Sequence, residues 1–293
     1  MKEKASFVHG EGNTMSLIDA IRDMFSYSFL LRAMIVGVLV SLCASLLGVS
    51  LVLKRYSMIG DGLSHVGFGA LAIASAIGIA PLYVAVPVVI AAAFILLRIS
   101  NSKVMGDAAI AIISSGALAL GVLTVSLAGT NTDLESYMFG SIMSISNSDT
   151  VFSIILSSVL IVLYVLFYNR IFAVTFDETF SKATGTNTGL YNTVIAILIA
   201  ITIVLGMRIM GALLISSLII FPCLTAMRVC KSFGSVCIFS GVQSVTCFII
   251  GMLFSYMLGT PTGASIVIVN VIVLIIFSII GYSVKAIKNK LNK

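Results

Sequence analysis

Long apolar runs alternate with short polar or charged stretches along most of the chain. A helix needs about 20 apolar residues to cross a hydrocarbon core of about 30 Å, and each run is close to that length. The pattern therefore predicts membrane-spanning helices. We place them at 32–53, 59–78, 81–98, 108–128, 151–168, 190–207, 210–227, 234–258 and 262–284.

The predicted fold is all-α, a polytopic membrane protein with eight or nine transmembrane helices. The count has two values because the run at 210–227 is short, and a broken or partly re-entrant segment is the alternative there. Residues 1–31 are predicted to be a polar tail followed by an interfacial helix, since apolar positions recur at helical spacing in the second half. Residues 32–284 are expected to form one transmembrane domain, and 285–293 a basic tail.

Composition supports the membrane assignment. Of 293 residues, 59% are hydrophobic and 10% are charged, and the mean hydropathy is +1.17. These values exclude a water-soluble globular domain. The net charge of +6 does not indicate a nucleic-acid partner, because no basic block interleaves with aromatic residues.

The basic residues instead predict the orientation of the chain in the membrane. If the loop at 169–189 is cytoplasmic, twelve lysines and arginines lie on the cytoplasmic side and five lie outside. This distribution follows the excess of positive charge that cytoplasmic loops carry. The nine-span prediction then places the N-terminus outside and the C-terminus inside the cell.

The stretch from Met58 to Gly78 carries the most unusual polar residues of any predicted span. Asp61 and His65 are four residues apart, about one helical turn, so they share one face of a helix. A charged side chain inside a membrane helix costs about 2.5–3.5 kcal/mol, so it usually faces a partner, a cavity or a substrate. Carboxylate and imidazole are both ligands for divalent transition metals. A metal or proton site is the functional interpretation, and a short surface ion pair at the cytoplasmic end of the span is the alternative.

The opposite face of the same stretch is rich in small residues. Gly62, Gly67 and Gly69 leave little side chain there, so a neighbouring helix can approach closely. Pro222 is a further packing candidate. It lies inside an apolar run, where a proline can bend a helix and free a carbonyl group.

A second candidate element lies in the predicted cytoplasmic loop. In the segment from Phe176 to Gly185, charged residues alternate with apolar ones, which predicts a short amphipathic helix. Taken alone, this pattern is most typical of a solvated loop helix. A glycine at position 185 is suited to end it.

Two motifs that would indicate an enzyme are absent from the sequence. The chain has no GxxxxGK[ST] phosphate-binding loop, so it is not expected to hydrolyse ATP by itself. It also has no HExxH motif, which argues against an intramembrane metalloprotease.

Five sequence blocks occur in a fixed order over nearly the whole chain. They are GVLVSLCASLLGVSLVLKRYSMIGDGLSHVGFGALAIASAIG (Gly37–Gly78), YMFGSI (Tyr137–Ile142), FDETFSKATGTNTG (Phe176–Gly189), GALLISSLIIFPCLTAMR (Gly211–Arg228) and SYMLGTPTGASIV (Ser255–Val267). Together these blocks resemble the membrane permease of ATP-binding cassette importers for zinc and manganese. One such block would be weak, but five in the same order are specific.

The resemblance implies a type II-like importer permease that forms a homodimer, with Asp61 and His65 lining the ion path. One copy offers one carboxylate and one imidazole, whereas zinc generally takes four ligands, so two copies would complete the set. The resemblance also implies a coupling helix that docks on a separate cytoplasmic ATPase. That helix carries Phe176, Asp177, Glu178, Phe180 and Gly185.

The expected activity is import of a divalent metal across the plasma membrane, as in bacteria. Zinc is the first choice, and manganese or ferrous iron is the closest alternative, since carboxylate and imidazole suit all three. The partner ATPase would hydrolyse the ATP, an extracytoplasmic protein would deliver the metal, and no cofactor would stay bound. A secondary cation transporter remains the alternative from another class, although no inverted repeat is evident.

Overall fold

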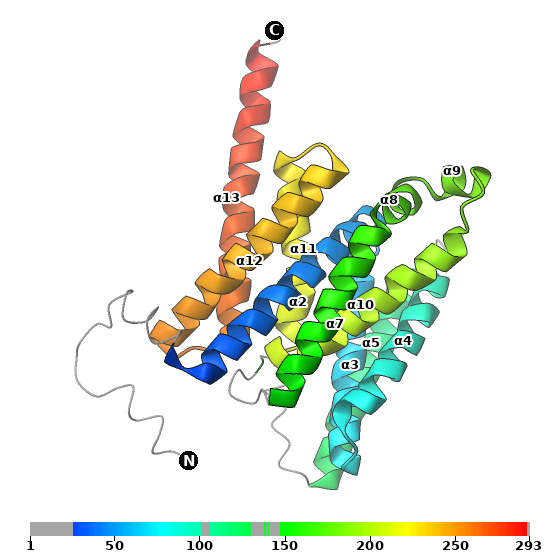
Figure 1. Cartoon of the computed structure of the whole chain (residues 1–293), viewed down its shortest axis with the longest axis vertical. Coiled ribbons are helices and arrows are strands. Elements are labelled where there is room, and N and C mark those ends of the chain that lie inside the picture. Colours follow the sequence, from blue (N-terminus) through cyan, green and yellow to red (C-terminus); the bar gives the residue numbers. More distant parts are fainter. Residues whose placement is uncertain (1–25, 101–105, 130–137, 139, 141–146, 292–293) are drawn as a thin grey trace.

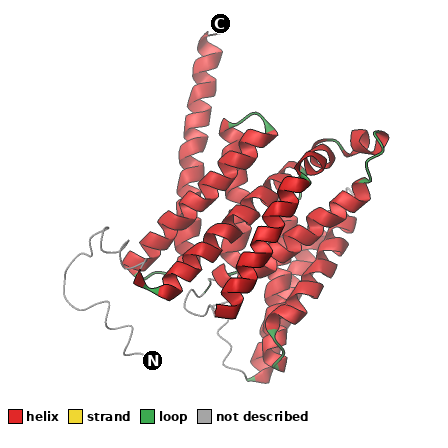
Figure 2. Ribbon diagram, viewed as in Figure 1, coloured by secondary structure: helices red, strands yellow, loops and turns green. Residues whose placement is uncertain are grey.

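The computed structural model describes residues 26–100, 106–129, 138, 140 and 147–291. The predicted polar tail and most of the predicted interfacial helix lie outside these residues. The described chain is built from helices and carries no strand in these ranges (Figure 2). In order, the helices are α2 (Ser28–Leu53), α3 (Ser57–Ile77), α4 (Pro81–Ser100), α5 (Gly106–Ala128), α7 (Asn147–Leu166), α8 (Tyr168–Phe176), α9 (Glu178–Ala183), α10 (Thr188–Met210), α11 (Ala212–Val229), α12 (Phe233–Leu258) and α13 (Thr262–Leu291).

The all-α membrane fold is confirmed. Within the described ranges, seven helices are long and apolar enough to cross a membrane, and α7 with α8 makes an eighth if that bent pair is one span. Helix α3 is less apolar because it carries Asp61, His65 and several glycines. Its 21 residues give a length of about 31 Å, and it packs against α4, α5 and α11, so we count it as a further span.

The structure agrees with the predicted span at 210–227 and not with its alternative, and it places a break where none was predicted. The run at 210–227 is neither broken nor re-entrant, because α11 is a continuous helix of 18 residues that keeps Pro222 in its interior. The break falls elsewhere, between α7 and α8, whose axes differ by 67°. Helix α8 turns there because Ile171 and Val174 are buried, and it packs against α10 and α2.

Helix α13 is longer than predicted. It has 30 residues and continues to Leu291, whereas the predicted span ends at 284. Its backbone stays helical because 285–291 contains no glycine or proline and several lysines, which are good helix formers. At 1.5 Å per residue the helix is about 45 Å long, and its last turns stand clear of the other helices (Figure 1).

The glycines of α3 lie against neighbouring helices. A Cβ atom on Gly62 would lie 2.8 Å from both Ile110 Cγ2 and Ser114 Oγ of α5. A Cβ atom on Gly67 would collide with the Met207 side chain of α10, and one on Gly69 would collide with the backbone oxygen of Ala117. The α3 and α5 backbones therefore approach as closely as glycine allows.

The bundle has two distinct ends (Figure 1). The corner between α2 and α3, helices α8 and α9, and the C-terminus lie at one end. The turn between α3 and α4 lies at the other. This places the predicted cytoplasmic segments together.

Candidate functional site

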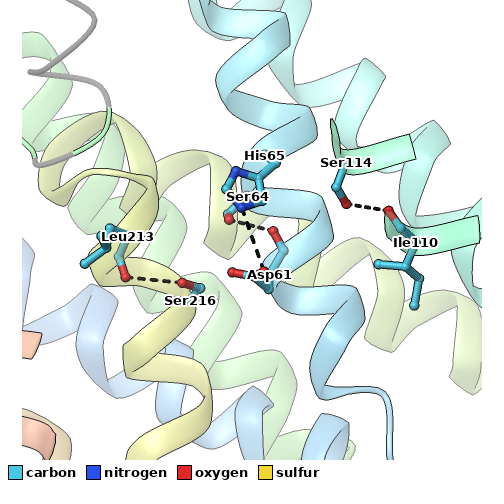
Figure 3. Close-up of polar contacts among 7 residues, drawn as sticks. All are labelled: Asp61, Ser64, His65, Ile110, Ser114, Leu213 and Ser216. Atoms are coloured by element: carbon cyan, nitrogen blue, oxygen red, sulfur yellow. Dashed lines mark hydrogen bonds and ion pairs between the residues drawn. The ribbon is translucent and has the colours of Figure 1, made fainter. Parts of the chain in front are cut away.

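Asp61 and His65 lie in the first half of α3 on one face of the helix (Figure 3). His65 Nε2 is 3.8 Å from Asp61 Oδ2, which is an ion-pair separation but too long for a hydrogen bond. The exposed fractions of the two side chains are 34% for His65 and 47% for Asp61. Ser64 between them is buried, and its hydroxyl donates to the Asp61 carbonyl oxygen at 2.7 Å. Only the acid and the imidazole therefore remain free to meet a third group.

The pair faces the side of α3 where α11 packs. Figure 3 places Ser216 of α11 on the side of Asp61, while Ile110 and Ser114 of α5 lie on the other side of α3. The Ser216 hydroxyl donates to the Leu213 carbonyl oxygen at 3.2 Å, within its own helix. Sequence reasoning missed Ser216. Its signal in the sequence is the pair of serines inside an otherwise apolar run.

Within the described ranges, no group of three or more His, Cys, Asp or Glu side chains is placed to hold a metal ion. One chain thus brings two candidate ligands together, where zinc generally takes four. The described cysteines are free thiols spread over other helices, so they add nothing to this pair. A metal bound here would need its remaining ligands from water or from a second copy of the chain.

The predicted coupling segment is two helices rather than one. Phe176 ends α8, and Asp177 is an extended residue with φ −148° and ψ 97°. The Asp177 carboxylate accepts a hydrogen bond from the Phe180 backbone N–H at 2.8 Å, which caps the N-terminus of α9. The prediction of a single helix over 176–185 fails because it treats Asp177 as a surface charge and not as a cap.

The C-terminal end of α9 matches the prediction for Gly185. This glycine has φ +80°, a left-handed conformation that favours glycine. The Gly185 N–H donates to the Lys182 carbonyl at 3.1 Å, and the Thr186 N–H donates to the Ser181 carbonyl at 3.0 Å. These two bonds make a Schellman motif, which holds the short helix in a defined shape.

Helix α9 presents apolar rings to the outside. Phe180 is 65% exposed and Phe176, at the end of α8, is 73% exposed. Ser181 on the other side is buried, and Glu178 pairs with Lys182 at 3.0 Å. Two exposed phenylalanines, one at the end of α8 and one on the capped helix α9, form an apolar surface outside the bundle that a partner can cover.

These features together define a multi-pass α-helical membrane protein with a polar pair in one span. The chain belongs to the ABC 3 transport family, whose model matches residues 26–281. It is thus recognised as the membrane permease subunit of ATP-binding cassette metal importers.

Comparison with individual proteins agrees with this family. The chain is 28% identical to the manganese transport system membrane protein MntC of Listeria monocytogenes, over 87% of this chain and 92% of MntC. It is 29% identical to the high-affinity zinc uptake system membrane protein ZnuB of Haemophilus influenzae, over 83% and 94% of the two chains. A chain of the solved structure of PsaBC from Streptococcus pneumoniae in complex with Fab matches with a TM-score of 0.81 and 27% identity. That match covers 89% of this chain and 95% of the other.

Proposed function

We propose that this chain imports a divalent metal along a path between two copies of itself, and that Asp61 and His65 contact the ion. The observation that supports this most is the half-exposed carboxylate and imidazole, 3.8 Å apart, on a helix of an apolar bundle. Exposing a carboxylate and an imidazole to lipid costs free energy, whereas a second copy of the chain would shield both groups from lipid. A two-fold axis beside this face would bring two carboxylates and two imidazoles together.

Zinc is the first candidate for the transported ion. Imidazole suits zinc well, and two carboxylates with two imidazoles fit its preference for four ligands. Manganese is the second candidate, because carboxylate oxygens suit it and a relative carries manganese in its name. Ferrous iron accepts the same ligands. A transit site must also release its ion, so four ligands shared between two chains serve better than a closed structural site.

The proposal includes two protein partners. A cytoplasmic ATPase subunit would bind α9 and supply the energy, and an extracytoplasmic metal-binding protein would deliver the ion. The family match favours this arrangement over a secondary cation transporter.

Reconstitution into liposomes tests the function directly. The full chain, purified with its ATPase and supplied on the opposite side with its extracytoplasmic metal-binding protein, should take up radiolabelled zinc or manganese only when ATP is supplied on the ATPase side. Native mass spectrometry of the same sample should give two permease copies. Metal uptake in liposomes that hold the chain without the ATPase would support the secondary transporter instead, and no ATP-dependent uptake of zinc, manganese or ferrous iron would refute the proposal.

A substitution in α9 tests the ATPase contact. Replacing Phe180 with aspartate should reduce ATP-driven metal uptake by at least about tenfold, because a buried charge would replace an apolar ring at the interface. The measurement is metal uptake and ATP hydrolysis by the reconstituted complex. Phe180→Leu, which keeps an apolar side chain, should retain most of the uptake. Normal uptake by the aspartate variant would identify α9 as a passive loop helix.

A further inference from the structure

A polar cluster joins α9 to the ends of two membrane helices. Glu178 of α9 pairs with Lys182 at 3.0 Å and also accepts a hydrogen bond from the Asn192 side chain at the start of α10. Lys54, the C-cap residue that follows α2, donates from Nζ to Asn192 Oδ1. The Asn192 amide therefore links a carboxylate on the short helix to an ammonium group at the end of a membrane span.

The charges in this cluster depend on one another. Burial lowers the pKa of the half-buried Lys54 ammonium, and the negative charge of Glu178 acts in the opposite direction. Burial on its own would raise the pKa of Glu178. Hydrogen bonds from Lys182 and Asn192, with the charges of Lys182 and Lys54, outweigh it and hold that pKa below its usual value. The opposite charges of Lys54 and Glu178 thus each favour the charged form of the other.

Lys54 lies at the tight corner between α2 and α3. Its backbone N–H donates to Ser50 at the end of α2, and α3 begins three residues later at Ser57. Between them, Arg55 has φ +61°, a left-handed conformation that is uncommon for a residue with a side chain. The Tyr56 N–H donates back to the Leu51 carbonyl at 2.8 Å, which closes the corner. The Lys54 side chain therefore extends from a tight corner that leads directly into α3.

We propose that Lys54 is a positioning residue that carries movement of α9 to the α2–α3 corner, and so to Asp61 and His65. The inference rests on the proposed function, since it assumes that an ATPase moves α9. The chain of contacts is Glu178 to Asn192 to Lys54. Asp61 follows in the second turn of α3, seven positions after Lys54. The sequence places Lys54 in the first family block and among the twelve basic residues predicted to be cytoplasmic, without a link to Asn192.

The test replaces Lys54 with methionine, which keeps much of the side chain's length and removes its charge. The reconstituted complex should keep its ATPase subunit and its basal ATP hydrolysis. The number of metal ions moved per ATP should fall by at least about fivefold, the lower end of typical couplings between sites. Lys231→Met is the matched control. Lys231 is an exposed lysine at the turn between α11 and α12, and its variant should move metal at the normal ratio.

Two further variants separate coupling from stability. Lys54→Arg keeps the charge and should restore most of the ratio. Combining Lys54→Met with Glu178→Gln should lower the ratio no further than Lys54→Met does, because both remove the same link. A normal ratio in Lys54→Met, or loss of the bound ATPase or of thermal stability in that variant, would overturn the inference. A wild-type complex that moves no metal with ATP would instead refute the proposed function.

Discussion

Alanine at position 61 or 65 is expected to abolish metal uptake. Asp61 and His65 are the two candidate ligands that one described chain brings together, so each substitution would remove half of the protein ligands at a two-fold site. The expected loss exceeds about 100-fold, since even partners outside the ligand shell typically cost about 10–100-fold in affinity or activity. Uptake of radiolabelled zinc or manganese by the reconstituted complex is the measurement.

Ser64→Ala is the matched control for these variants. Ser64 lies on the same turn but is buried, and its hydroxyl is bonded to the backbone of α3. Its alanine variant should transport metal at close to the normal rate. If the Asp61 and His65 variants transport equally well while remaining folded, the pair is not part of the ion path.

Gly69→Ala is expected to destabilise the permease. Among the α3 glycines that face α5, alanine should cost the most at this position. A Cβ atom at Gly69 would collide with the backbone oxygen of Ala117 on α5, and no change of side-chain rotamer can relieve a collision with backbone. Overpacking typically costs about 1–3 kcal/mol, and we expect the upper end of that range. The measurement is the thermal unfolding temperature of the detergent-purified chain.

Gly116→Ala provides the comparison, because it is the same chemical change on α5. A Cβ atom at Gly116 would meet no atom within 4 Å, so that variant should be neutral or more stable by up to about 1 kcal/mol from helix propensity. Equal unfolding temperatures for the two variants would mean that α3 and α5 do not approach as closely as described.

Much of the fold is readable from the sequence, because the hydrocarbon core sets the length of each apolar run. Each predicted span corresponds to a described helix, and apart from the break between α7 and α8 the differences lie at the ends of elements. The bend after Leu166 is not readable, since no proline or glycine marks it. It arises from the burial of Ile171 and Val174 in α8, which depends on the other helices.

The candidate site was partly predictable. Spacing alone places Asp61 and His65 on one face, and the left-handed conformation of Gly185 follows from its position at a helix end. The boundary at Asp177 could not be read because a capping carboxylate and a surface charge look alike in sequence. Lys54 and Asn192 are 138 positions apart in the sequence, so no local sequence pattern predicts their contact. The roles assigned to these residues stay predictions.

The close contact between α3 and α5 limits how the site can move. Gly69 of α3 and Gly121 of α5 bring the two backbones into contact. Helices α3 and α5 should therefore move as one rigid unit, so a large shift of Asp61 would also move α5. The outer face of α5 exposes Ile112, Leu120 and Leu127, which fatty acyl chains would cover. Each turnover would then rearrange the surrounding lipids, so acyl-chain length and fluidity of the host membrane should influence the speed of transport.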